Sequence, residues 1–209
     1  EILLETFLAR LKPRFEVSVL LPKYPVDRWS PWAVACALAR TDILLFGGGG
    51  IFQDKTGILS LLYYTSLIIL ARLLGRQIVL LGQGIGPLSP INLTLTRAVL
   101  RLADKITVRD AASLKLLEGL NVSLTADSAL LWDGIRNPPA RVPADPPKKI
   151  IFIPREGDAA LPRALRQAAI TAERMGAVLE TLSWRTPLEA AAHLAGADLI
   201  ISMRLHGLI

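Results

Sequence analysis

The stretch Ile43-Leu-Leu-Phe-Gly-Gly-Gly-Gly50 places a fully apolar run directly before four glycines. A continuous apolar run followed by turn residues is typical of a strand buried on both faces of a parallel sheet. Further strands are expected at residues 15–21, 77–81, 105–109, 122–125, 150–153, 177–182 and 199–201. Helices are expected at residues 1–11, 32–40, 57–74, 93–103, 111–117, 161–175 and 187–194. This alternation predicts an α/β protein.

A proline-dense segment divides this alternation into two series. Residues 134–148 are rich in proline and lack an apolar period, which predicts a stiff linker. Residues 1–133 are then expected to form an N-terminal Rossmann-like domain, and residues 149–209 a C-terminal one. The second series supplies few strands, so we expect the C-terminal domain to be truncated and the sequence to be a fragment or a set of joined pieces.

The composition favours a folded protein with an anionic partner. Hydrophobic residues make up 52% of the chain and charged residues 20%, which allows a substantial core. The net charge of +6 is spread without a basic block, and aromatic residues are only 6%. Nucleic-acid binding is therefore disfavoured, and an anionic small molecule or membrane surface is expected instead. The single cysteine, Cys36, excludes a disulfide framework and indicates a reducing compartment.

The most apolar stretch of the sequence is residues 58–74. It includes Tyr63, Tyr64 and Arg72, and it falls short of the roughly 20 apolar residues that a membrane-spanning helix needs. A buried helix is the first interpretation, and a peripheral contact with a membrane or a second subunit is the alternative. No signal peptide is visible, so we expect a cytoplasmic protein. A peripheral location at the inner face of the membrane and a homo-oligomer both stay open.

Two glycine-rich segments follow neighbouring strands. Gly47–Gly50 leads into Gln53 and Asp54, and Gly82-Gln-Gly-Ile-Gly-Pro87 follows the next strand. Glycines let backbone N–H groups approach an anion closely, and a helix N-terminus adds its dipole. The spacing matches neither a P-loop nor a dinucleotide fingerprint. Two such strand ends on one sheet predict a shared ligand crevice, and tight turns alone are the structural alternative.

Arginines at three strand ends suit an anionic ligand. Arg109 and Arg155 each follow a strand, and Arg204 follows another, two residues before His206. In an open α/β sheet, ligands bind at the carboxyl ends of the strands. A guanidinium can hold an anion, and an imidazole titrates near neutral pH and can move a proton. The alternative is a solvated Arg109 beside the helix cap Asp110, with Arg204 and His206 as ordinary surface residues.

A metal site built by the protein is not expected. The chain has two histidines and one cysteine, and its carboxylates are not clustered. No cofactor is expected either, because no cofactor motif is found.

Five segments together resemble the polysaccharide pyruvyl transferases, most closely the bacterial cell-surface type that acts on secondary cell wall polymers. They are Leu44-Leu-Phe-Gly-Gly-Gly-Gly-Ile-Phe-Gln-Asp54, Leu81-Gly-Gln-Gly-Ile-Gly-Pro87, Ile106-Thr-Val-Arg-Asp110, Thr125-Ala-Asp127 and Ile201-Ser-Met-Arg-Leu-His-Gly-Leu-Ile209. The resemblance implies a GT-B-like fold, in which two Rossmann-like domains enclose a cleft. The N-terminal domain would face the acceptor and the C-terminal domain the donor.

The resemblance also implies an activity. It is the transfer of a pyruvyl group from phosphoenolpyruvate to a sugar, as a ketal, with release of phosphate. The acceptor implied is an N-acetylmannosamine unit of a lipid-linked cell-surface polysaccharide. The predicted catalytic residues are His206 and Arg204, and the predicted substrate-binding residues are Arg155, Arg109, Gly48, Gly49, Gly50, Gln53, Asp54, Gln83, Gly84 and Ser202. Arg155 matches the family less closely, because Ile153-Pro-Arg-Glu156 departs from the usual strand end.

Two other functions fit the same sequence less well. A GT-B glycosyltransferase that uses a nucleotide sugar would release a nucleoside diphosphate in place of free phosphate. A binding module without catalytic activity would explain the +6 charge but would leave phosphoenolpyruvate unchanged.

Overall fold

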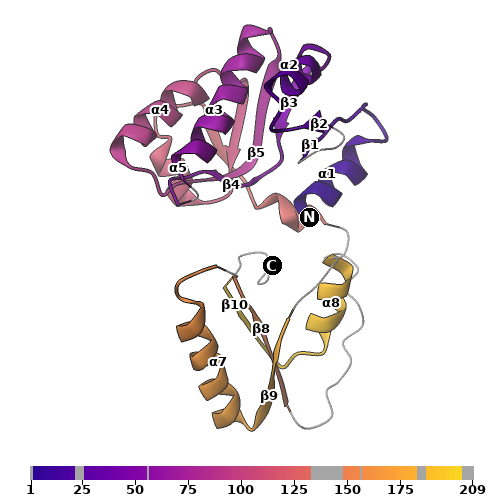
Figure 1. Ribbon diagram of the computed structural model, residues 1–209, viewed down its shortest axis with the longest axis vertical. Coiled ribbons are helices and arrows are strands. Elements are labelled where there is room, and N and C mark those ends of the chain that lie inside the picture. The colour runs from indigo at the N-terminus through magenta and orange to yellow at the C-terminus, as the bar shows by residue number, and fades with distance from the viewer. Residues whose placement is uncertain are drawn as a thin grey trace. The chain divides into compact units, whose positions relative to one another are not determined.

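The computed structural model describes residues 2–21, 26–55, 57–132, 148–155, 157–182 and 187–203. The chain divides into two compact units (Figure 1). The first unit is Leu3–Ser128, and the second unit is Glu1–Ile2 with Ala129–Ile209. Helices and strands alternate in both units, and every paired strand is parallel to its neighbour. The expectation of an α/β protein is therefore confirmed.

The first unit is built on a five-stranded sheet. Its strands follow the order β3-β5-β6-β7, and β4 also pairs with β5. The helices up to residue 116 are α1 (Ile2–Leu11), α2 (Pro31–Ala39), α3 (Ile58–Leu73), α4 (Pro90–Leu100) and α5 (Ala111–Leu116). The strands are β1 (Leu20–Leu21), β2 (Val26–Asp27), β3 (Ile43–Phe46), β4 (Gly49–Phe52), β5 (Gln77–Ile85), β6 (Lys105–Val108) and β7 (Val122–Leu124).

Three helices cover one face of this sheet. The connections through α3, α4 and α5 all step in the same direction across the strand order. Because such crossovers are right-handed, the three helices lie on the same face. Alternate residues of the strands point to that face and are buried against the helices: Leu44, Phe46, Ile78, Leu80, Ile106 and Val108. The apolar runs at residues 43–46, 77–81 and 105–109 are therefore core strands, as expected.

The first glycine-rich segment contains a strand that the sequence pattern does not reveal. β3 pairs with the first half of β5, and β4 continues along its second half, where Gly49 lies opposite Gln83 and Phe52 opposite Ile85. The expectation that β5 ends at Leu81 is wrong, because this pairing extends the strand to Ile85. Glycine is a poor strand former, so propensity alone favours a loop here.

Two other boundaries differ from expectation. The strand expected at residues 15–21 is reduced to Leu20–Leu21, which pairs with β2, and Phe15 is exposed. The α4 helix begins at Pro90 and not at Leu93, because the Ser89 hydroxyl accepts a hydrogen bond from the backbone N–H of Asn92. Proline is favourable in the first helical turn, where its missing N–H has no role.

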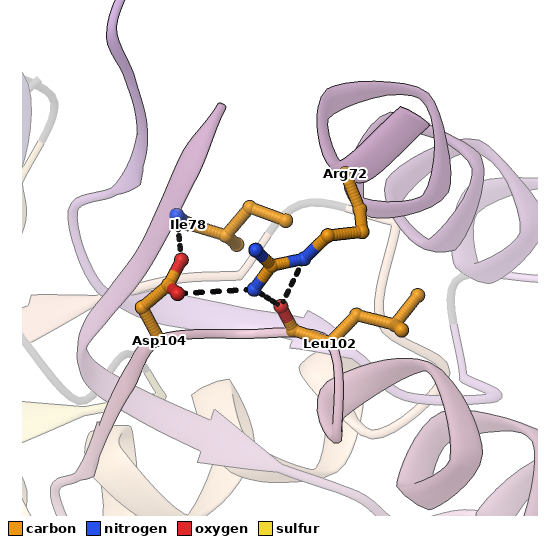
Figure 2. A network of polar contacts seen from close by, with 4 residues as sticks. All are labelled: Arg72, Ile78, Leu102 and Asp104. Carbon is orange, nitrogen blue, oxygen red and sulfur yellow. Dashed lines mark hydrogen bonds and ion pairs between the residues drawn. The ribbon is translucent and has the colours of Figure 1, made fainter. Parts of the chain in front are cut away.

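A polar network fixes the end of α3 to the start of β6 (Figure 2). Arg72 donates hydrogen bonds to the carbonyl oxygen of Leu102 and forms an ion pair of 3.0 Å with Asp104. The other carboxylate oxygen of Asp104 accepts the backbone N–H of Ile78 at 2.7 Å. These N–H groups lower the pKa of Asp104, first through Ile78 and then through Arg72. The network sets the register of β6 beside β5.

The second unit is organised around β8. Its elements are the 3-10 helix η1 (Ser128–Leu131), β8 (Lys148–Ile153), α7 (Leu161–Met175), β9 (Ala177–Thr181), α8 (Pro187–Ala195) and β10 (Leu199–Ser202). The strand order is β10-β8-β9, and Ile150–Ile153 are fully buried. The helices α7 and α8 lie on opposite sides of this sheet (Figure 1). The linker expected at residues 134–148 lies outside the described residues, except for Lys148.

The chain direction across the second sheet reverses at β8. From β8 the chain moves to β9 on one side and then returns through α8 to β10 on the other. The carboxyl ends of β8 and β10 therefore flank a topological switch point, where ligands bind in open α/β sheets.

No helix in the described part of the chain is both long and apolar enough to cross a membrane.

Candidate functional site

The carboxyl end of the first sheet holds a partly buried ion pair. Arg109 follows β6, and its backbone N–H donates to the carbonyl oxygen of Gln83 at 3.2 Å. Its guanidinium Nη1 lies 2.6 Å from Oδ2 of Asp127. The two side chains are only 19% and 7% exposed, so solvent screens this pair weakly. Arg109 is therefore not the solvated arginine of the structural alternative.

Asp110 caps α5, as that alternative supposed. Its carboxylate accepts a hydrogen bond of 2.7 Å from the backbone N–H of Ser113. It lies 3.9 Å from Nε of Arg109, which is a looser contact than the one with Asp127. The Ser113 hydroxyl accepts the backbone N–H of Ile85 at 2.8 Å and joins α5 to the end of β5.

Glycines of the two segments make room for side chains of the protein itself. A Cβ on Gly84 would lie 2.8 Å from Nη2 of Arg109, and one on Gly50 would lie 3.8 Å from the same nitrogen. A Cβ on Gly82 would lie 2.6 Å from the Ser128 hydroxyl. The guanidinium thus rests on bare backbone, with Nη2 directed towards Gly50 and Gly84. We call Gly50, Gly84, Arg109, Asp127 and Ser128 the first-unit cluster.

The remaining predicted residues of the glycine segment surround this cluster. Gly48 and Gly49 have φ of +107° and +92°, values that side chains rarely adopt. A Cβ on Gly48 would lie 3.4 Å from the Ser128 hydroxyl. The Gln53 side-chain amide donates to the carbonyl oxygen of Gly50 and shapes the same turn.

Gln83 lies below the cluster and not at its surface. Its side chain is fully buried and donates to the carbonyl oxygen of Phe46 at 3.3 Å. Its Oε1 has no hydrogen-bond partner among the described residues. Such a buried acceptor is unusual in a folded protein. A direct contact with a ligand stays a prediction for Gln83.

Asp54 joins the glycine segment to α4. Its carboxylate accepts the backbone N–H of Ser89, and the Asn92 side-chain amide donates to it at 2.8 Å. The pKa of Asp54 is lowered, with the Ser89 N–H as the largest cause. Both carboxylate oxygens are engaged by the start of α4, so the contacts seen for Asp54 are structural.

The second unit brings Arg155 and Ser202 to one sheet edge. Ser202 is in register with Ile153, and the backbone N–H of Met203 donates to the carbonyl oxygen of Ile153 at 2.9 Å. Arg155 lies two residues beyond Ile153, and its side chain is 52% exposed. Its Nε is 3.9 Å from the Asp158 carboxylate, which is a long and solvent-screened contact. Arg204 and His206 lie outside the described residues.

The two sheet edges therefore offer different electrostatics. In the first unit a guanidinium and a carboxylate are in close contact, so the pair presents little net charge. In the second unit Arg155 keeps an accessible positive charge. Among the described residues, no group of histidine, cysteine, aspartate and glutamate side chains is placed to hold a metal ion.

Sequence reasoning missed three residues of the first sheet edge. Asp127 and Ser128 lie shortly after the end of β7. The third residue is Thr107, whose hydroxyl accepts the backbone N–H of Gly82 at 2.8 Å. For Asp127 and Ser128 the available signal was positional, because polar residues just after a strand reach the same edge as those of its neighbours. Thr107 lies within β6 and carries no such signal. The ion pair of Asp127 with Arg109 could not be read from that signal alone.

Parallel sheets that alternate with helices define the class as an α/β protein. The sequence model of the polysaccharide pyruvyl transferase family matches residues 2–209. The chain therefore belongs to the polysaccharide pyruvyl transferase family and is an enzyme of this kind. Searches of curated proteins and of solved structures found no match.

Proposed function

We propose that this enzyme transfers the pyruvyl group of phosphoenolpyruvate to a sugar of a cell-surface polysaccharide, forming a ketal and releasing phosphate. The proposed acceptor is a lipid-linked N-acetylmannosamine unit, presented at the cytoplasmic face of the membrane. The family match over residues 2–209 carries this proposal. The exposed Arg155 at the β8–β10 switch point supports it, because a phosphorylated carboxylic acid requires a cationic site.

The donor is assigned to the second unit. Phosphoenolpyruvate carries about three negative charges near neutral pH, and arginine pairs bidentately with both carboxylate and phosphate. Ile153 and Ser202 are paired in register on adjacent strands. Arg155 lies two residues after Ile153, and Arg204 lies two residues after Ser202. Two guanidiniums that follow paired residues of adjacent strands suit a clamp on the donor, with Ser202 beside them.

The chemistry requires two proton movements. Two sugar hydroxyls attack the central carbon of the donor, its methylene carbon gains a proton to become a methyl group, and phosphate leaves. One hydroxyl proton balances the methyl group, and the other leaves with phosphate. A histidine titrates in the working range and can both accept and donate these protons. We assign His206 this general acid and base role.

The acceptor is assigned to the first unit. The Arg109–Asp127 pair combines hydrogen-bond donors with acceptors at little net charge, which suits sugar hydroxyls better than a trianion. Gly48, Gly49 and Gly50 would contribute backbone N–H groups beside it. Two Rossmann-like units in a GT-B-like arrangement would let the donor and acceptor sites meet across a cleft, and this arrangement is part of the proposal.

The direct experiment mixes the purified protein with phosphoenolpyruvate and soluble analogues of candidate acceptors and follows phosphate release. Free phosphate and an acceptor heavier by one pyruvyl ketal, measured by mass spectrometry, are the expected products. Phosphate release without acceptor modification would contradict pyruvyl transfer. Incubation of the same acceptors with nucleotide sugars is the control for glycosyl transfer, and we expect no nucleoside diphosphate from it.

A further inference from the structure

The outer face of α3 is apolar except for Ser66. Exposed residues recur at alternating spacings of three and four: Leu59, Leu62, Ser66, Ile69 and Leu73. Leu59 and Leu73, at the two ends, are 80% and 79% exposed. This spacing places the residues in one stripe on a helix surface. The opposite side of α3 packs into the core through residues such as Leu61 and Ile68.

Neighbouring elements extend this stripe with large apolar side chains. The Trp29 ring packs on Tyr63 of α3 with ring centroids 6.1 Å apart, and Trp29 is itself 66% exposed. Trp32 lies in the first turn of α2, which packs against α3, and it is 78% exposed. Ile91, at the start of α4 on the other flank, is exposed as well. We call Trp29, Trp32, Leu59, Leu62, Ile69 and Leu73 the α3 surface.

The chain around this surface has a net positive charge. Residues 27–104 contain seven lysines and arginines and four aspartates, a net charge of +3 out of the total of +6. One of those aspartates, Asp104, is ion-paired with Arg72. No acidic residue occurs in α2, α3 or α4. Arg28 lies beside the α3 surface, with its guanidinium carbon 4.5 Å from the centroid of the Trp29 ring. An apolar stripe that is flanked by tryptophans and arginines matches the chemistry of peripheral membrane binding.

We propose that the α3 surface binds an anionic lipid membrane, with its leucines and tryptophans at the acyl boundary and the surrounding cations at the headgroups. Charge complementarity decides between this partner and a second copy of the chain. Two copies joined through α3 would bring together two regions that each carry +3, whereas anionic lipids attract the same region. Tryptophan also favours the boundary between water and lipid.

The test is flotation of the full chain with lipid vesicles. One set contains phosphatidylcholine alone, and the other contains phosphatidylcholine with phosphatidylglycerol. The test variant is Leu59→Gln with Leu73→Gln, at positions so exposed that the fold should tolerate the change. The matched control is Leu165→Gln with Leu188→Gln, which removes two exposed leucines from α7 and α8 of the second unit. A thermal melt of each variant checks folding.

We expect the wild type to float with the anionic vesicles and much less with the neutral ones. The α3 variant should bind anionic vesicles at least about tenfold more weakly, because two leucines no longer leave water on binding. The control variant should bind like the wild type. Arg28→Gln should reduce the preference for anionic over neutral vesicles.

Three results would overturn the proposal: no vesicle binding by the wild type, unchanged binding by the α3 variant, or equal binding to neutral and anionic vesicles. A dimer in sedimentation velocity that the α3 variant dissociates, without vesicle binding, would assign the surface to a second copy. The proposal builds on the membrane-associated acceptor proposed above, because it names the surface through which the enzyme would reach the membrane. Flotation needs no turnover, so its failure would leave pyruvyl transfer to a soluble acceptor standing, and a failed transfer assay would leave membrane binding standing.

Discussion

The two sheets begin alike and end differently. At the amino end of β6, Asp104 accepts the backbone N–H of Ile78 at 2.7 Å and returns its own N–H to the Ile78 carbonyl. At the amino end of β10, Asp198 makes the same two contacts with Lys149. An aspartate before a strand thus sets the register of adjacent strands in both units. Among the described residues, the carboxyl ends differ in how their arginines are paired.

The difference between the carboxyl ends separates two kinds of recognition. Arg109 is held on bare backbone and lies in close contact with Asp127, so its charge is largely compensated. Arg155 is half exposed, and its contact with Asp158 is long. A compensated pair can orient hydroxyl groups without attracting anions strongly, whereas an uncompensated cation attracts a phosphorylated donor. The proposed division between acceptor and donor follows from this contrast.

The largest expected effect is on the chemical step. His206→Ala should reduce ketal formation by about 100-fold to 10,000-fold, because the group that moves both protons is lost. Phosphoenolpyruvate should still bind, which isothermal titration of the variant would measure. The exposed His193→Ala is the matched control and should retain activity. Full activity of the His206 variant would remove this residue from the mechanism.

The next effect distinguishes the two arginines by substrate. Arg155→Gln should raise the KM for phosphoenolpyruvate by roughly tenfold or more, since a hydrogen bond to a charged group contributes about 1.5–3 kcal/mol. Arg109→Gln should chiefly raise the KM for the acceptor. Steady-state kinetics with each substrate varied in turn would measure both. If Arg109→Gln alone weakened donor binding, the assignment of the two sheet edges would have to be reversed.

A third effect concerns stability, where the Arg109 variant should lose more than the Arg155 variant. Arg109→Ala should lower the free energy of unfolding by about 3 kcal/mol, because it leaves the buried Asp127 carboxylate without its guanidinium. Arg155→Ala should change it by less than about 0.5 kcal/mol, as expected at an exposed position. Urea unfolding of both variants and of Arg109→Ala with Asp127→Ala would test this. Additive losses in the double variant would show that the two side chains are not coupled.

Sequence patterns predicted those parts of the fold that depend on local signals. The helix α7 lies at the expected residues, because its amphipathic period ends at Gly176, a left-handed cap with φ of +58°. The strand β4 was missed, because Gly49 and Gly50 have low strand propensity and become strand only by pairing with β5. Long-range pairing overrides local preference at that point.

The candidate site likewise contains residues that local patterns predicted and contacts that only long-range pairing creates. The sequence predicted the strand ends that carry Arg109 and Arg155, because apolar runs and the residues that follow them are local features. It did not predict that Asp127 compensates Arg109, since the two residues meet only when β6 and β7 lie side by side. That the glycines of these segments also make room for a ligand stays a prediction. The structure shows that Gly84 and Gly82 make room for the side chains of Arg109 and Ser128, a contact between distant residues that the sequence pattern did not reveal.

The smallest expected effect tests the feature that the two sheets share. The pKa of Asp104 lies below its ordinary value of 3.8, because the Ile78 N–H and Arg72 stabilise the carboxylate. Its contribution to stability is therefore present at neutral pH and is lost as the pH falls through that lowered pKa. Asp104→Asn should destabilise the fold at pH 7 by less than about 1 kcal/mol, since the side chain is 43% exposed and screened by solvent. The difference from the wild type should shrink below about pH 4 in urea titrations. A difference that stayed constant with pH would mean that Asp104 acts through its shape and not through its charge.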